Sequence, residues 1–325
     1  MPHSTRGSVM PEPLVRPDQA HFFASLDDDV LAAVDAVDET EAPASMWSDA
    51  WRNLRARPLF WVSAAVILLV VVVAIFPRLF THTDPGFCEL TNSLKRPVAG
   101  HPFGYDFQGC DIYARTVYGA RASVAVGVLT TILVTVLGAV IGAIAGFYGG
   151  WFDALLSRVT DIFFAIPFVL AAVLVMAMFR AHRNIFTVVL VLGIFGWPQI
   201  ARITRGAVMS VKNADFITAA KALGASKPAA LVRHVMPNSL APIIVTATVS
   251  LGTFIVAEAT LSFLGLGLPT SVVSWGADVA KAQVQLRSYP GILFYPAGAL
   301  ALTVLGFIMM GDAVRDALDP KARKR

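Results

Sequence analysis

The chain has 325 residues, of which 56% are hydrophobic and only 15% are charged, and its mean hydropathy is +0.66. Soluble domains carry about 25% charged residues, so this composition excludes an ordinary soluble domain and indicates a protein embedded in lipid. The formal net charge of +4 is small. The basic residues gather at the edges of apolar runs, which argues against nucleic-acid binding.

The first segment, residues 1–46, is polar and contains an acidic stretch between residues 27 and 41. It has too little apolar surface to offset the entropy of ordering, so we expect a disordered acidic tail on the cytoplasmic side. Its interleaved apolar residues also fit a short amphipathic helix that binds a partner. Residues 47–57 fit either an interfacial helix, with Trp47 and Trp51 on one face, or a cationic stop beside the first span.

Long apolar runs predict six transmembrane helices, because about 20 consecutive apolar residues are needed to cross a bilayer. Lipid offers no partner to backbone N–H and C=O groups, so we expect helices rather than strands. The fold class predicted is an all-α polytopic membrane protein. Its spans are residues 59–76, 122–147, 162–179, 185–203, 240–268 and 292–311.

The flanking Lys and Arg residues favour an orientation with both termini in the cytoplasm. The loop 205–239 then faces the cytoplasm, as does a basic tail at 314–325, and the segments 81–121 and 269–290 face outward. We expect a multi-pass protein of the plasma membrane. The first span and the outer segment form a unit at 47–121, ahead of a core at 122–313.

The chain has two cysteines, Cys88 and Cys110, and both lie in the first outward segment. A pair of cysteines in one loop outside the cytoplasm favours a disulfide. A disulfide that closes this loop would stabilise the fold by about 3 kcal/mol, because it lowers the entropy of the unfolded chain. The alternative is two unpaired thiols.

Two residues inside the predicted spans are unusual. Pro167 follows an apolar stretch and predicts a kinked helix, which either lines a gate or simply packs against its neighbours. Glu258 is the one carboxylate well inside a predicted span, and such a group is costly in a membrane unless it is paired or lines a cavity. It lies either on a translocation path near an outer gate or beside a structural partner, which is an Arg or the backbone of a neighbouring helix.

The loop between the fourth and fifth spans predicts two short helices. Residues 213–223 are rich in Ala and lack helix breakers. Gly224 is suited to end that helix, and Ser226 to cap a second one that has Pro228 in its first turn. We expect Pro237 to stop the second helix before the next span. Ala side chains on this knob let another protein approach the backbone closely, and the alternative is an ordinary basic loop.

This loop resembles the docking loop of permease subunits of bacterial ATP-binding-cassette (ABC) importers. That family reads Glu-Ala-Ala, three residues, Gly, nine residues, an apolar residue, one residue and Leu-Pro. The matching positions here are Thr218-Ala219-Ala220, Gly224, His234 and Met236-Pro237. Thr218 replaces the usual acid and Met236 the usual Leu. Residues 101–121 and 257–276 resemble the dipeptide and oligopeptide branch, although Cys110 stands where that branch usually has Arg.

The resemblance covers about 47–318 and implies the type I importer permease fold with a peptide-carrying, non-catalytic subunit. It implies as partners a second homologous permease, two ABC ATPases that hold ATP and Mg²⁺, an external substrate-binding protein and membrane lipids. It also implies that Trp275 lies on a surface that meets that binding protein. The residues assigned to ATPase docking are Phe216, Ile217, Thr218, Ala219, Ala220, Lys221, Gly224, His234, Met236 and Pro237.

Other functions remain open from the sequence. The same permease pattern serves nickel and other small solutes. An ion-coupled secondary transporter would need broken helices at corresponding positions in two halves, and Glu258 and Pro167 do not correspond in that way. A membrane scaffold or receptor would leave the loop 205–239 without a role.

Overall fold

The structure is a computed structural model that describes residues 46–318, and the regular elements of this part are helices. The predicted all-α class is confirmed. The expected acidic tail lies outside the described residues except for Met46, and so do residues 319–325 of the expected basic tail. The long helices are α2 (Pro58–Ile75), α3 (Ile112–Tyr148), α4 (Gly150–Ala165), α5 (Phe168–Met178), α6 (Ile185–Val211), α9 (Met236–Phe263) and α11 (Gly291–Leu318).

Shorter elements lie at the ends of these helices. α1 (Met46–Arg55) precedes α2, so residues 47–55 are helical as one of the two interpretations requires. The others are α7 (Asp215–Ala222), α8 (Lys227–Ala230), α10 (Trp275–Ala282), a π-helix (Leu231–Val235) and 3-10 turns at Pro77–Leu79, Leu90–Asn92, Arg180–His182 and Gln283–Gln285.

Six spans are confirmed, since five helices are long and apolar enough to cross a membrane and the bent pair of α4 and α5 makes a sixth. Several predicted bounds were too short. α3 begins at Ile112 rather than at residue 122, because Asp111 caps it: its Oδ1 accepts from the N–H groups of Tyr113 at 2.8 Å and Ala114 at 3.1 Å. The boundary expected between 121 and 122 therefore falls inside one helix.

The third span is broken rather than kinked. α4 and α5 meet at an angle of 81°. Ile166 is extended, with φ −95° and ψ 122°, which is the conformation that a following proline favours. Pro167 lacks an N–H and cannot continue the ladder of α4. The prediction of one bent helix over 162–179 is thus corrected to two helices.

α3 and α6 form the most extensive helix pair. The spacing Gly138, Gly142, Gly146 lies along their contact, where small residues let two helices approach closely. The main apolar core fills the space between α3, α5, α6 and α9, and its fully buried members include Met176 and Leu192. α2 packs on α11 and α3, and Ser63 and Ala74 are its only buried residues.

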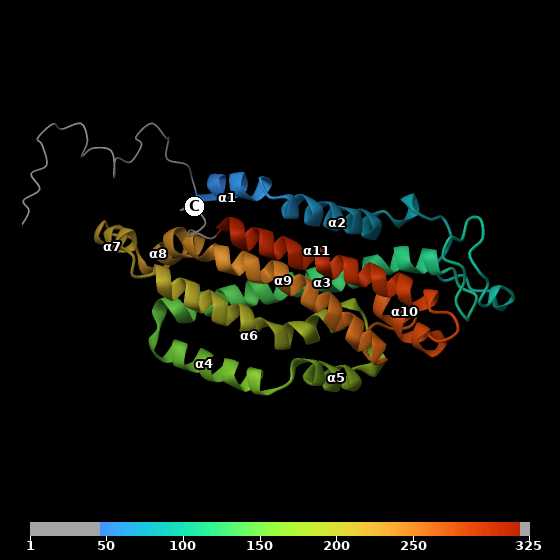
Figure 1. Cartoon of the computed structure of the whole chain (residues 1–325). Helices are drawn as coiled ribbons and strands as arrows, with labels where there is room; N and C mark the ends of the chain where they lie inside the picture. The colour runs from blue at the N-terminus through green and yellow to red at the C-terminus, as the bar shows by residue number, and fades with distance from the viewer. Residues whose placement is uncertain (1–45, 319–325) are drawn as a thin grey trace, which may run out of the picture. The chain divides into compact units, whose positions relative to one another are not determined.

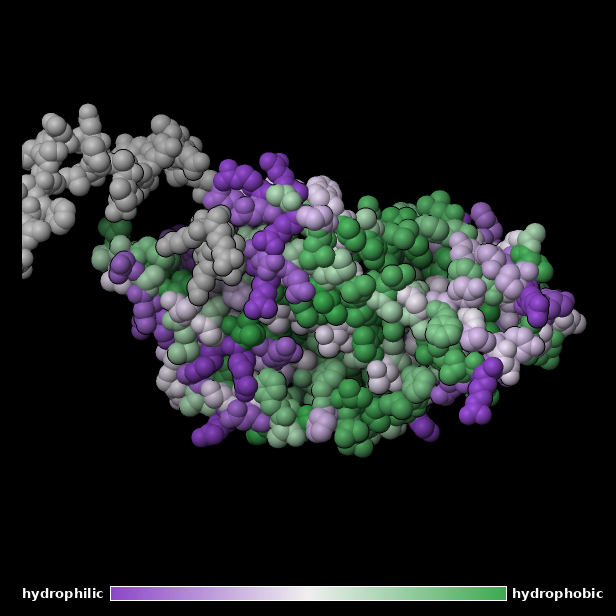
Figure 2. All heavy atoms as spheres, viewed as in Figure 1, coloured by the Kyte–Doolittle hydropathy of each residue, from purple (hydrophilic) through white to green (hydrophobic). Residues whose placement is uncertain are grey.

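The bundle has two distinct ends (Figure 1). We call the end that carries α7 and α8 the knob end, and the end that carries α10 and residues 77–111 the cap end. An ion pair of 2.6 Å between Arg57 and Asp316 places the start of α2 beside the end of α11, at the knob end. Figure 2 shows hydrophobic residues across the middle of one face and hydrophilic residues gathered toward the ends. Highly exposed apolar side chains such as Leu68 and Leu170, each 64% exposed, are suited to face lipid.

Candidate functional site

The candidate docking element is the knob, residues 212–239, and local signals determine its shape. α7 ends in a Schellman motif: the N–H of Ala225 bonds to the carbonyl of Ala220 and that of Gly224 to Lys221, both at 3.0 Å. Gly224 has φ 92°, which glycine adopts without a steric penalty. Ser226 then caps α8 by accepting from the N–H of Ala229 at 3.4 Å. α7 begins and ends close to where the sequence predicts, and α8 begins at the predicted cap.

Ile217 roots the knob in the bundle. Its side chain is fully buried in a cluster with Ala143 of α3, Val208 of α6 and Val235 of the π-helix. Met236 packs against the same cluster. These two residues, assigned to docking from the sequence, therefore face inward. They hold α7 and the start of α9 against the helices of the bundle.

The outer surface of the knob combines small and apolar groups. Thr218, Ala219, Lys221 and Gly224 are exposed, as the docking assignment requires. Phe216 is 49% exposed.

Two apolar residues on the knob were missed. Leu223 is 90% exposed and Val232 is 66% exposed. A leucine placed between an Ala-rich helix and Gly224, in a loop that does not enter the membrane, was the available signal. Exposed apolar groups outside the lipid are typical of a protein interface.

The helices beneath the knob are joined by charged groups. The ammonium of Lys212 donates to the carbonyl of Gly146 at 2.7 Å. The guanidinium of Arg205 bonds both carboxylate oxygens of Asp153, with Nη2 to Oδ2 at 2.8 Å, and so ties α6 to α4. Lys212 and Lys221 also line a pocket of about 340 Å³ below the knob. Lys227 lines the same pocket, so three lysines of the knob lie around one hollow.

Pro237 does not stop a helix, which corrects the prediction. The chain is helical from Lys227 through the π-helix and into α9, with Pro237 in the first turn of α9. The wider π turn, in which bonds run from i to i+5, accommodates the proline where an α turn would clash. The side-chain amide of Asn238 donates to the carbonyl of His234 at 2.7 Å and satisfies one backbone acceptor of this region. His234 and Pro237 are half-buried.

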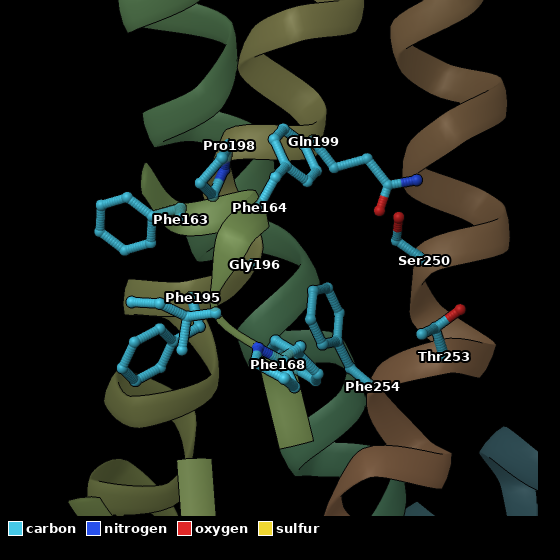
Figure 3. A pocket seen from close by; sticks show the side chains of 12 residues that line it. Phe163, Phe164, Phe168, Phe195, Gly196, Pro198, Gln199, Ser250, Thr253 and Phe254 are labelled. Carbon is cyan, nitrogen blue, oxygen red and sulfur yellow. The ribbon is translucent and has the colours of Figure 1, made fainter. Parts of the chain in front are cut away.

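A second candidate site is a pocket of about 270 Å³ at the break between α4 and α5, where Pro167 lies. Figure 3 shows phenylalanine rings from α4, α5, α6 and α9 around it, and polar groups reaching in from α6 and α9. Gln199 and Ser250 point toward each other across it. Neither residue was predicted from the sequence, although a carboxamide in the middle of an apolar run was a usable signal.

Glu258 lies toward the cap end, inside the bundle. Its side chain is fully buried. The hydroxyl of Ser123 on α3 donates to its Oε2 at 3.0 Å, and that of Ser262 to its Oε1 at 2.7 Å. Ser123 also accepts from the N–H of Trp275 at 3.3 Å. In this conformation Glu258 joins α3 to α9 through serine hydroxyls rather than through an Arg or the backbone of a neighbouring helix.

The cap end is held by buried contacts. Trp275 is 2% exposed, and its indole N–H donates to the carbonyl of Thr116 at 2.8 Å. The expectation that it meets a binding protein is therefore wrong, because the ring is inside the bundle and its one donor is paired. A disulfide joins Cys88 to Cys110, with their Cα atoms 4.1 Å apart.

An ion pair connects α3 to α10 at the cap end. Nε of Arg115 donates to Oδ1 of Asp278 at 3.0 Å, and Nη2 bonds the same oxygen. Nη1 of Arg115 donates to the carbonyl of Pro85 at 3.1 Å. Burial raises the pKa of Asp278, and the positive charge of Arg115 opposes that rise. The predicted site residues thus fall into three places: the docking set at the knob end, Pro167 at mid-depth, and Glu258 with the cysteines toward the cap end.

Comparison with known proteins gives two family matches. The family described as "Binding-protein-dependent transport system inner membrane component" matches residues 138–324, and the one described as "N-terminal TM domain of oligopeptide transport permease C" matches residues 45–97. The oligopeptide transport system permease protein OppC of Bacillus subtilis (strain 168) is 39% identical over 292 residues, which cover 90% of this chain and 95% of that protein.

Glutathione transport system permease proteins GsiD are also similar. The one from Shigella flexneri serotype 5b is 39% identical over 278 residues, and the one from Escherichia coli O157:H7 is 37% identical over 278 residues. In both cases the match covers 85% of this chain and 91% of the relative. With six apolar spans and two matching families, the chain belongs to the binding-protein-dependent transport system inner membrane components, the permease subunits of ABC importers.

Proposed function

We propose that this chain is one of two membrane subunits of an ATP-driven importer that carries short peptides across the plasma membrane. The peptide class is supported by the oligopeptide and glutathione transport systems for which the relatives are named. In this proposal a second homologous permease completes the passage. Two ATPases bind ATP and Mg²⁺, and an external binding protein delivers the peptide.

The knob is the part that receives force from the ATPase. Its exposed Phe216 and Leu223 seat in an apolar groove of the ATPase, and the surrounding lysines complement an acidic rim. Ile217, buried under α7, passes the displacement to α3 and α6. Closure of the ATPases around ATP then favours one of two arrangements of the bundle, so that the passage opens alternately to the two sides.

The orientation follows from the same assignment. The knob end lies in the cytoplasm, as do both termini, and the cap end with its disulfide lies outside. Labelling with a membrane-impermeant maleimide in intact cells tests this placement. A cysteine introduced at Thr218 stays unlabelled until the cells are made permeable, whereas one introduced at Val284, which is 79% exposed at the cap end, is labelled at once. The reverse pattern contradicts the proposal.

The observation that carries this function is an exposed apolar knob rooted in the bundle core, and a charge placed on it tests the function. Leu223→Asp adds a carboxylate to a surface that docking would desolvate, so we expect the amount of co-purified ATPase to fall at least tenfold. Val284→Asp makes the same change to an exposed apolar residue at the opposite end, and the ATPase remains bound. Equal retention of ATPase by the two variants refutes the docking role.

A further inference from the structure

The pocket at the break between α4 and α5 lies at mid-depth in the bundle. Gln199 is near the middle of α6, about 20 Å from either end of that helix at 1.5 Å per residue. Ser250 is near the middle of α9. Backbone that leaves the helical ladder at this depth is tolerated in a membrane only where it is buried in protein or lines a cavity. The break at Pro167 is therefore unsuited to face lipid, and the pocket that Pro167 lines makes the break part of a cavity wall.

The polar groups of the pocket lead to the same conclusion. Gln199 is exposed, and Ser250 is 7% exposed and lines the pocket. Within residues 46–318 neither side chain is hydrogen-bonded. An unpaired carboxamide facing hydrocarbon would be costly. This face of α6 and α9 is thus turned toward water or a solute.

The lining of the pocket combines two kinds of group (Figure 3). Phenylalanine rings, among them Phe164 of α4 and Phe168 of α5, share it with the polar side chains of Gln199, Ser250 and Thr253. All 12 lining residues are uncharged. The volume of about 270 Å³ is below the range of about 300–1,000 Å³ that holds a whole small ligand. The pocket is suited to one apolar group attached to a polar chain.

We propose that this pocket binds one apolar side chain of a peptide in transit, while Gln199 and Ser250 hydrogen-bond the peptide main chain. This inference rests on the proposed function and adds a binding site to it. Because the walls carry no charge, the site holds a neutral side chain and leaves the charged peptide termini outside. An apolar side chain in such a pocket gains roughly tenfold in occupancy over a small polar one.

Photolabelling of the complete importer tests the site directly. The probe is a tripeptide with alanine at both ends and a central p-benzoylphenylalanine, added to the unmodified complex in lipid vesicles, with mass spectrometry to locate the label. We expect label within residues 163–168, 195–199 and 250–254, and competition by Ala-Phe-Ala at least tenfold stronger than by Ala-Ser-Ala. Label elsewhere overturns the proposal. So does labelling of these residues by a photoreactive phospholipid but not by the peptide, because the occupant is then an acyl chain.

A matched pair of variants on α9 adds a second test. Ser250→Leu fills the pocket and is expected to reduce labelling at least tenfold. Thr260→Leu makes a similar change on the same helix outside the pocket and leaves the labelling unchanged. Co-purification of the partner subunits shows that each variant is folded and assembled. Undiminished labelling of Ser250→Leu refutes the site.

Failure of this inference is distinguishable from failure of the proposed function. ATP-driven uptake of Ala-Phe-Ala by the unmodified complex, together with label outside the pocket, leaves the importer intact and removes only the site. Absence of ATP-driven uptake of any peptide removes the proposed function instead. Labelling of the pocket in that case still supports the site, because it is measured without transport.

Discussion

We predict that Gly142→Ala destabilises the contact between α3 and α6. A Cβ at Gly142 would lie 2.3 Å from the carbonyl oxygen of Ala201 and 2.9 Å from the Cβ of Thr204. The first atom belongs to the backbone of α6, so no side-chain rotation can relieve the clash. Overpacking of this kind costs about 1–3 kcal/mol, and the gain of Ala over Gly in a helix is about 1 kcal/mol. Because the clash is severe, we expect the free energy of unfolding to fall by about 1–2 kcal/mol in Gly142→Ala.

Gly206→Ala is the matched control, since Gly206 lies on α6 and an added Cβ there meets no atom within 4 Å. The free energy of unfolding of this variant should rise by about 0.5–1 kcal/mol, because alanine loses less backbone entropy than glycine on folding. Unfolding of the purified chain in mixed micelles of dodecyl maltoside and SDS, followed by circular dichroism, gives the two free energies of unfolding. The same sign for both variants would refute the reasoning.

Three further predictions concern groups toward the cap end. Glu258→Ala leaves two serine hydroxyls without their acceptor, so we expect the free energy of unfolding to fall by about 1–3 kcal/mol in the same titration. Glu258→Gln retains an acceptor, so its free energy of unfolding should fall by less. Equal losses for the two variants would count against the role of the carboxylate. Asp278→Asn leaves the buried guanidinium of Arg115 without its counter-charge and should lower the free energy of unfolding by about 3 kcal/mol. Asp316→Asn is the control, because it disrupts an exposed ion pair, and it should lower the free energy of unfolding by less than about 1 kcal/mol. A smaller loss for Asp278→Asn than for Asp316→Asn would contradict the role of the buried pair. Alkylation of the non-reduced protein should leave Cys88 and Cys110 unlabelled, and their reduction should cost about 3 kcal/mol; labelling of both without reductant would disprove the disulfide.

Local signals in the sequence were sufficient for the number of spans and for the shape of the knob. The apolar runs predicted six spans because bilayer thickness imposes a length on each helix. Gly224 and Ser226 predicted the end of α7 and the start of α8, since both act on the hydrogen bonds of adjacent residues. The resemblance to ABC importer permeases was confirmed by the family matches.

Predictions that depended on long-range packing were less successful. Pro167 was expected to kink one helix, and the chain instead forms two helices that meet at 81°. Pro237 was expected to end a helix, but a π turn absorbs it. Trp275 was expected at the surface, and its burial follows from the contact of α10 with α3 and α9.

The sequence by itself determined that this chain lies in lipid, how many times it crosses, and where it turns, because composition and neighbouring residues decide those properties. Only the tertiary structure decided which side chains share a surface. It buried Ile217 and exposed Leu223 on the same short knob. It also brought Gln199 of α6 opposite Ser250 of α9 across a pocket at the broken helix. Such pairings arise from the packing of distant helices, about which the residues next to each side chain carry no information.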